Sequence, residues 1–241
     1  MKLSQWETIS GCPIEIGGVC HIRQPSLSDI RDIGYSTFFE YVGVIMFDPN
    51  ELDENMPLVL PEEGAFLFLL YAPAFRQTLM KALPFFVQEE VRFNCEELCF
   101  EVIKGEEIVG RINNNNFLDI QSVIIQTIGG EKESDRGLRF QSKKAREIYE
   151  KCKARKKGFD KQKKSGSTDS SYTLPNVISS VCAKHPSLNF TNIWDLTILQ
   201  LYDQFRRLSV ITYESVEGLR WAAWGKDSIE LSAWYKDLSK Q

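Results

Sequence analysis

The chain has 241 residues, of which 43% are hydrophobic and 26% are charged, and its formal net charge at pH 7 is −4. This composition is that of an ordinary globular protein, and it excludes a collagen, a wholly disordered chain and a disulfide-stabilised miniprotein. A chain of this length buries enough apolar surface to fold without a metal or disulfides, as one large domain or two small ones.

The first half of the chain predicts helices and two short hairpins. Residues 14–16 alternate apolar and charged side chains before a Gly-Gly pair, which is typical of a hairpin over residues 14–22. Ser26 and Asp29 have capping-box spacing, and the helix they start is expected to run to about residue 47. The other elements predicted here are helices over 62–83 with a bend at Pro73, over 84–91 and over 117–128, and a second hairpin over 98–112.

The charge is unevenly distributed along the chain. Residues 1–142 carry 11 Lys and Arg against 22 Asp and Glu, a balance of −11. Residues 143–164 carry 11 basic against 3 acidic residues, a balance of +8, and a Ser- and Gly-rich stretch follows them. This pattern favours a solvated helix end followed by a flexible linker. An open alternative is that the basic segment docks on an acidic surface, either of a partner or of this chain's own acidic half. Binding of nucleic acid is disfavoured, because the segment lacks interleaved aromatic residues.

Two helices are predicted after the linker. Thr173 followed by Pro175 is typical of a helix start. The second helix is predicted from five apolar residues that recur at steps of four and three, namely Trp194, Ile198, Leu201, Phe205 and Leu208. We expect Thr191 or Asn192 to cap this helix and the basic pair at 206–207 to lie at its C-terminal end, where the helix dipole favours cations.

Four of the five tryptophans follow residue 190, which favours a small second core and leaves an aromatic docking face open. The fold class expected from these patterns is α+β, mainly α-helical with two short β-hairpins. We expect three parts: an acidic N-terminal domain at 1–154, a basic, Ser-rich linker at 155–172 and a small, Trp-rich helical domain at 173–241.

The sequence contains no recognisable catalytic or cofactor motif. It lacks Gly-rich phosphate loops, nucleophile elbows and metalloprotease or kinase signatures, and its two histidines, His21 and His185, stand alone. The six cysteines include no C-x-x-C pair, which favours reduced thiols over a zinc site. We therefore expect a protein that is not an enzyme and has no cofactor or metal. Without an apolar leader or an apolar stretch of bilayer length, it is expected in the cytoplasm, without membrane contact.

Three stretches resemble proteins of the tail-assembly-chaperone type, encoded in the tail-assembly region of phages and prophages of Gram-positive bacteria. The first contains IEIGG at residues 14–18 and IRQPSLSDI at 22–30. The second is NIWDLTILQLYDQFRRL at 192–208, and the third has WGKD at 224–227 and WY at 234–235. The resemblance implies a chaperone that coats the helical tape-measure protein in the host cytoplasm, and also contacts tail-tube subunits, with no cofactor and no reaction.

Two hypotheses of different class follow for this chain. The first is a non-catalytic tail assembly chaperone, and the alternative is a structural component of the phage tail. The candidate partner-binding residues lie in the basic stretch and among the C-terminal tryptophans: Lys156, Lys157, Lys163, Lys164, Trp221, Trp224 and Trp234.

Overall fold

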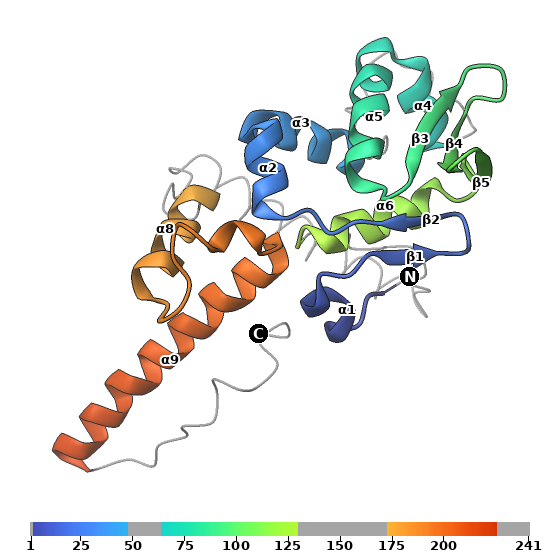
Figure 1. Ribbon diagram of the computed structural model, residues 1–241. Helices are drawn as coiled ribbons and strands as arrows, with labels where there is room; N and C mark the ends of the chain where they lie inside the picture. The colour runs from blue at the N-terminus through green and yellow to red at the C-terminus, as the bar shows by residue number, and fades with distance from the viewer. Residues whose placement is uncertain (1, 48–63, 130–172, 226–241) are drawn as a thin grey trace, which may run out of the picture.

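A computed structural model describes residues 2–47, 64–129 and 173–225. These residues form a mainly helical α+β fold with two small antiparallel sheets, which confirms the predicted fold class (Figure 1). The elements in chain order are α1 (Gln5–Ser10), β1 (Ile14–Ile16), β2 (Cys20–Ile22), α2 (Leu27–Ile33), α3 (Tyr35–Met46), α4 (Ala65–Tyr71), α5 (Pro73–Phe86), β3 (Glu90–Asn94), β4 (Cys99–Lys104), β5 (Glu107–Ile112), α6 (Phe117–Thr127), α8 (Leu174–Lys184), the 3₁₀ helix η3 (Ile193–Asp195) and α9 (Ile198–Trp224).

Both predicted hairpins form. β1 and β2 pair with Ile14 opposite Ile22, so that the apolar side chains of both strands point into the core and the turn falls at the Gly-Gly pair. The second hairpin, β4–β5, is joined on its other side by β3, which gives the sheet order β3-β4-β5. β3 replaces part of the helix predicted over 84–91, because α5 already ends at Phe86 and the chain then becomes extended.

Two predicted long helices are each divided. The helix expected from residue 27 to 47 breaks at Gly34, whose φ of 87° is open to glycine but costly for other residues, so α2 and α3 are separate helices. The helix expected over 62–83 breaks before Pro73, which occupies the first turn of α5, where a missing backbone N–H does no harm. α5 then continues through Pro84 to Phe86, three residues into the piece predicted as a separate helix.

The core forms around α6. Five of its apolar side chains are completely buried, namely Phe117, Ile120, Val123, Ile124 and Ile125. Gln121 on the same helix is also buried, and its amide donates hydrogen bonds to the carbonyl oxygens of Ile45 (2.5 Å) and Phe47 (3.2 Å). α6 therefore fixes the end of α3 through polar contacts as well as apolar packing, and the buried amide does not remain unsatisfied.

The two sheets meet at Gly110 in β5. A Cβ atom built on Gly110 would collide with the backbone of Val19, in the turn of the β1–β2 hairpin. Only a residue without a side chain therefore allows the hairpin turn to approach β5 this closely.

The base of α9 is joined to the N-terminal part of the chain. Ser26 and Thr197 form an antiparallel bridge, and the N–H of Leu27 donates to the carbonyl of Leu196 at 2.8 Å. The Arg31 guanidinium lies 5.3 Å from the centre of the Trp194 ring. Leu174, Val177, Val181, Ile193 and Leu201 join the same hydrophobic cluster as the core around α6.

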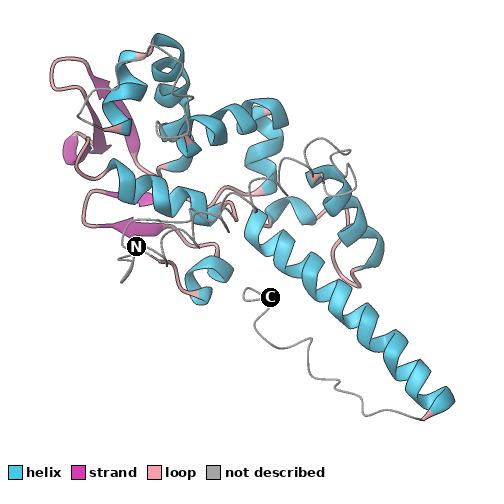
Figure 2. Cartoon of the chain, turned by 180° about the vertical axis from the view of Figure 1, so that it is seen from behind, coloured by secondary structure: helices cyan, strands magenta, loops and turns pink. Residues whose placement is uncertain are grey.

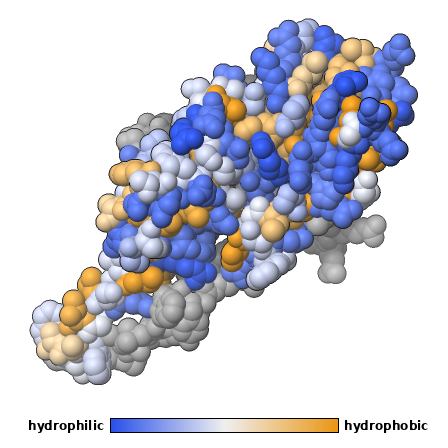
Figure 3. Space-filling model, in the orientation of Figure 1, coloured by the Kyte–Doolittle hydropathy of each residue, from blue (hydrophilic) through white to orange (hydrophobic). Residues whose placement is uncertain are grey.

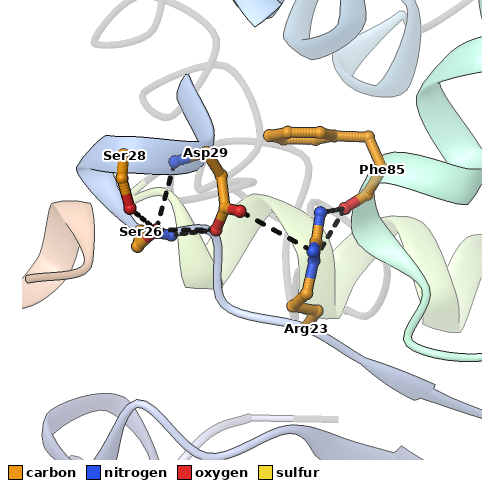
Figure 4. A network of polar contacts seen from close by, with 5 residues as sticks. All are labelled: Arg23, Ser26, Ser28, Asp29 and Phe85. Atoms are coloured by element: carbon orange, nitrogen blue, oxygen red, sulfur yellow. Dashed lines mark hydrogen bonds and ion pairs between the residues drawn. The ribbon is translucent and has the colours of Figure 1, made fainter. Parts of the chain in front are cut away.

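A polar network holds the segment that makes this junction (Figure 4). Ser26 and Asp29 form the predicted capping box of α2, in which each side chain accepts a hydrogen bond from the backbone of the other residue. The Arg23 side chain donates to the carbonyl of Phe85 at 2.8 and 3.1 Å, and one of its terminal nitrogens lies 3.8 Å from the Asp29 carboxylate. The strand–helix connection from β2 to α2 is therefore tied to the end of α5.

The predicted linker at 155–172 and the basic segment before it lie outside the described residues. The division into domains at 1–154 and 173–241 stays a prediction. Among the residues described, no helix is both long and apolar enough to cross a membrane.

Candidate functional site

α9, the longest helix of the described residues, extends away from the rest of the fold over its C-terminal half (Figures 1 and 2). It begins with a capping box, in which Thr197 and Gln200 satisfy each other's backbone N–H groups. It ends at Gly225, which has a left-handed φ of 55° and donates its N–H to the carbonyl of Trp221 at 2.7 Å. The helix therefore has defined caps at both ends.

The start and end of α9 both differ from the sequence prediction. Trp194 lies in the separate helix η3, so the cap of α9 is Thr197 and not Thr191 or Asn192. The basic pair at 206–207 does not end the helix, which continues for 17 more residues, from 208 to 224. Arg207 instead forms an ion pair with Asp203 one turn earlier, at 2.9 Å.

The first half of α9 is part of the core. Ile198 and Leu201 are buried, and Phe205 and Leu208 are partly buried against the same cluster. The side chain of Gln200 also donates to the carbonyl of Ile9 at 2.8 Å, which joins α9 to the end of α1. No described residue of α9 after Leu201 is buried. The base of the helix is thus held rigidly, whereas its second half is presented to solvent.

Large apolar side chains cover the second half of α9. Figure 3 shows apolar residues in orange along the helix towards its free end. Tyr213, Trp221 and Trp224, with exposed fractions of 67%, 53% and 70%, project from one side and are called the aromatic stripe here. At 3.6 residues per turn, Leu219 projects from the roughly opposite side and is 73% exposed. A helix that is apolar on two sides is typical of one that is covered by other protein.

Of the seven candidate partner-binding residues, the structure describes two. Trp221 and Trp224 lie three residues apart at the free end of α9, and both side chains are exposed. Trp234, Lys156, Lys157, Lys163 and Lys164 lie outside the described residues. Tyr213 was not identified from the sequence, although its spacing of 11 residues from Trp224 places both on one side of a helix.

A second candidate site is an open hollow of about 520 Å³ between His21, the start of β3 and the turn between β4 and β5. Glu89 makes two contacts with His21 there. One carboxylate oxygen accepts the His21 backbone N–H at 3.0 Å, and the other lies 2.5 Å from the ring nitrogen Nδ1. Burial alone would raise the pKa of Glu89, but these hydrogen bonds outweigh it and hold the pKa below its ordinary value.

The His21–Glu89 pair is suited to joining β2 to the start of β3. The carbonyl of His21 accepts the N–H of Gln88 at 2.9 Å, so both backbone groups of His21 are bonded to this connection. The adjacent thiol of Cys20 is buried, and burial together with the charge of Glu89 raises its pKa to about 12. Cys20 is therefore protonated at neutral pH and is a poor nucleophile. In the described parts of the chain, no group of three or more His, Cys, Asp and Glu could hold a metal ion.

Glu89→Gln is expected to lower the free energy of unfolding at neutral pH. It should also make that free energy less sensitive to a fall in pH. The pKa of Glu89 is lower in the folded than in the unfolded chain, so its contribution is present above the ordinary carboxyl pKa of about 4.3. That contribution to stability is lost as the pH falls through the lower pKa that Glu89 has in the folded chain. Urea unfolding at pH 7 should show a loss of about 1–3 kcal/mol, because the His21 N–H loses a charged acceptor. An unchanged unfolding midpoint at pH 7 would contradict this role.

One family of known proteins matches part of the chain. Residues 161–239 match the family model described as YomV second domain, and this match supports a phage-associated protein. It covers less than half of the chain and includes α8, η3 and α9. No curated protein and no solved structure matches the chain significantly.

Proposed function

We propose that this chain is a non-catalytic phage tail assembly chaperone, which binds the tape-measure protein and helps to recruit tail-tube subunits in the host cytoplasm. The observation that carries the proposal is the aromatic stripe on a helix whose base is fixed in the core. The match of residues 161–239 to a phage-associated domain and the resemblance to tail assembly chaperones support the same class of protein.

The aromatic stripe has the chemistry of a contact with another helix. Trp and Tyr are frequent anchors of protein interfaces, because they bury a large area and retain a polar group for the rim. Apolar side chains at helical spacing are typical of helix-in-groove and helix–helix recognition. The buried Leu201 fixes the base of α9 in the core. The backbone there is already ordered before a partner binds, so it adds little entropy cost to binding. A long helical partner such as a tape-measure protein suits this geometry.

The basic segment supplies the second part of the proposal. Residues 143–164 have a balance of +8, and clustered charge accelerates the encounter with an acidic partner. Such steering weakens with salt, because the screening length falls to about 8 Å at physiological ionic strength. A chaperone must bind and later release its partner, which favours an electrostatic contribution over a very large apolar interface.

Trp221→Ala is expected to weaken capture of the purified tape-measure protein at least about tenfold in Kd, because a buried Trp anchor is typically worth about 2 kcal/mol or more. Binding would be measured by biolayer interferometry with the full chain. Trp6→Ala is the matched control, since Trp6 is 81% exposed on α1, outside the aromatic stripe. Equal binding by the two variants and the parent chain would contradict the assignment of the aromatic stripe.

In the same assay, charge reversal at Lys156, Lys157, Lys163 and Lys164 should slow association at low salt and have little effect at high salt. The alternative function, a structural component of the tail, predicts that the chain is present in purified mature particles. A deletion strain that makes tails of normal length, or a chain that remains in the virion, would contradict the chaperone proposal.

A further inference from the structure

Two residues of opposite charge lie between the aromatic side chains on the free half of α9. Tyr213, Glu217, Arg220 and Trp224 recur at steps of four, three and four residues, which is the spacing of a coiled-coil seam. Their side chains therefore project from one side of the helix. A terminal nitrogen of Arg220 lies 3.5 Å from a carboxylate oxygen of Glu217, and the Arg220 side chain is 59% exposed. This side of α9 thus has an aromatic residue at each end and an exposed ion pair in the middle.

The order of these four residues is symmetric. Glu217 and Arg220 lie at equal distances from the midpoint between residues 218 and 219, and so do Tyr213 and Trp224. When two copies of a helix pair antiparallel about a two-fold axis, residues at equal distances on opposite sides of that axis face each other. A second copy of α9, reversed about this midpoint, therefore places its Trp224 opposite Tyr213 and its Arg220 opposite Glu217.

Each contact of this antiparallel pair is chemically matched. In the centre, the Glu217 carboxylate of each copy faces the Arg220 guanidinium of the other, which gives two ion pairs between the chains. At each end, the ring of Tyr213 meets the ring of Trp224, and pairs of aromatic rings attract each other beyond the area that they bury. A parallel pair would instead bring Glu217 against Glu217 and Arg220 against Arg220, and these like charges disfavour it.

The position of α9 in the fold leaves space for a second copy. The C-terminal half of α9 extends away from the rest of the fold, and no described residue of the helix after Leu201 is buried (Figure 1). Two antiparallel helices that overlap over residues 213–224 share a contact about 18 Å long. The base of α9 in the second copy then lies beyond the free end of the first, so the described cores of the two copies lie at opposite ends of the pair.

The size of this contact indicates a weak and reversible dimer. Its four aromatic side chains, at about 150–250 Å² each, bury at most about 1,000 Å² together. Stable interfaces bury about 1,200 Å² or more, and smaller contacts are typical of transient complexes. A dimer of this kind can form in the free chain and still open when another helix competes for the same side of α9.

We propose that the free half of α9 pairs with a second copy of this chain, antiparallel about the midpoint between residues 218 and 219, through Tyr213, Glu217, Arg220 and Trp224. The dimer covers Tyr213 and Trp224 of both copies, so a partner that binds the aromatic stripe must first displace the second copy. The pairing does not rest on the proposed chaperone function, because it needs no component other than the chain itself.

Sedimentation velocity of the purified full chain over a range of concentrations tests the pairing. The parent chain is expected to dimerise reversibly. Glu217→Arg and Arg220→Glu each bring like charges together in the centre, so each variant alone should dimerise at least about tenfold more weakly in Kd. An equimolar mixture of the two variants should restore the dimer, because one copy then carries two arginines and the other two glutamates.

Two further variants complete the experiment. The double variant, which carries both Glu217→Arg and Arg220→Glu in one chain, exchanges the two charges and should dimerise like the parent. Ala222→Glu is the matched control, because residue 222 is about 200° from Trp224 around the helix and lies on the other side. It adds a charge outside the contact and should also dimerise like the parent. Far-ultraviolet circular dichroism of each variant checks that the helix content is unchanged.

Three results would overturn the inference. The first is a parent chain that stays monomeric at every concentration. The second is a dimer that both single charge variants retain, which would assign it to another surface. The third is a mixture of the two folded variants that stays monomeric. A dimer that is lost in each single variant and regained in the mixture would support the pairing, whatever the outcome of the capture assay with the tape-measure protein.

Discussion

Leu201→Ala is expected to destabilise the protein by about 2–5 kcal/mol, the range for removing a fully buried leucine side chain. Leu201 is completely buried where α9 meets the core, close to the bridge between Ser26 and Thr197. The substitution removes apolar contacts and leaves a cavity that the fixed junction cannot easily close. Urea unfolding, followed by far-ultraviolet circular dichroism, measures the change in the free energy of unfolding.

Leu219→Ala on the same helix is the matched control. Leu219 is 73% exposed, and surface substitutions usually change stability by less than about 0.5 kcal/mol. An unchanged unfolding midpoint for Leu201→Ala would mean that the base of α9 is not part of the core, and would contradict the fold described above.

Gly110→Ala is expected to cost about 1–3 kcal/mol or more, although it adds only one methyl group. That methyl group would occupy space already filled by the backbone of Val19, which cannot rotate away as a side chain can. Either β5 or the turn of the β1–β2 hairpin must move, and the contact between the two sheets is lost. The loss would be measured by thermal unfolding, with the backbone shift observed in amide chemical shifts near Val19.

Gly43→Ala provides the control for this substitution. Gly43 lies inside α3, and a Cβ there meets no heavy atom within 4 Å. Alanine is a better helix former than glycine by about 0.5–1 kcal/mol, so this variant should be as stable as the parent or more stable. If Gly110→Ala were equally harmless, the close approach of the two sheets would not exist in solution.

The fold class and most elements could be predicted from the sequence because their signals are local. The capping box at Ser26 and Asp29 and the alternation before the Gly-Gly pair each lie within a few residues. β3 could not be predicted in this way, since Glu90 and Arg92 alternate with apolar residues without a turn signal before them. The strand forms because β4 is available to pair with it, and this is a tertiary effect.

The candidate site was predicted in part. Trp221 and Trp224 could be identified because tryptophans are concentrated in the last quarter of the chain. The apolar face of α9 was missed beyond Leu208, although Thr212, Val216 and Leu219 continue the steps of four and three. Thr212 is polar and interrupts an otherwise apolar pattern. The contact between His21 and Glu89 spans 68 residues and depends on how β2 meets the end of α5, so no local pattern could reveal it.

The continuity of α9 from Ile198 to Trp224 has a geometric consequence for any partner. Because no kink or loop separates the base from the free end, the direction in which Trp221 points is set by counting residues from Leu201. Deleting one residue between them would turn the free end by about 100° and shorten it by about 1.5 Å, while the buried base remained unchanged. Deleting seven would nearly restore the angle and shorten it by about 10 Å. The number of residues between Leu201 and Trp221 therefore sets both the direction in which the Trp221 side chain points and its distance from the core.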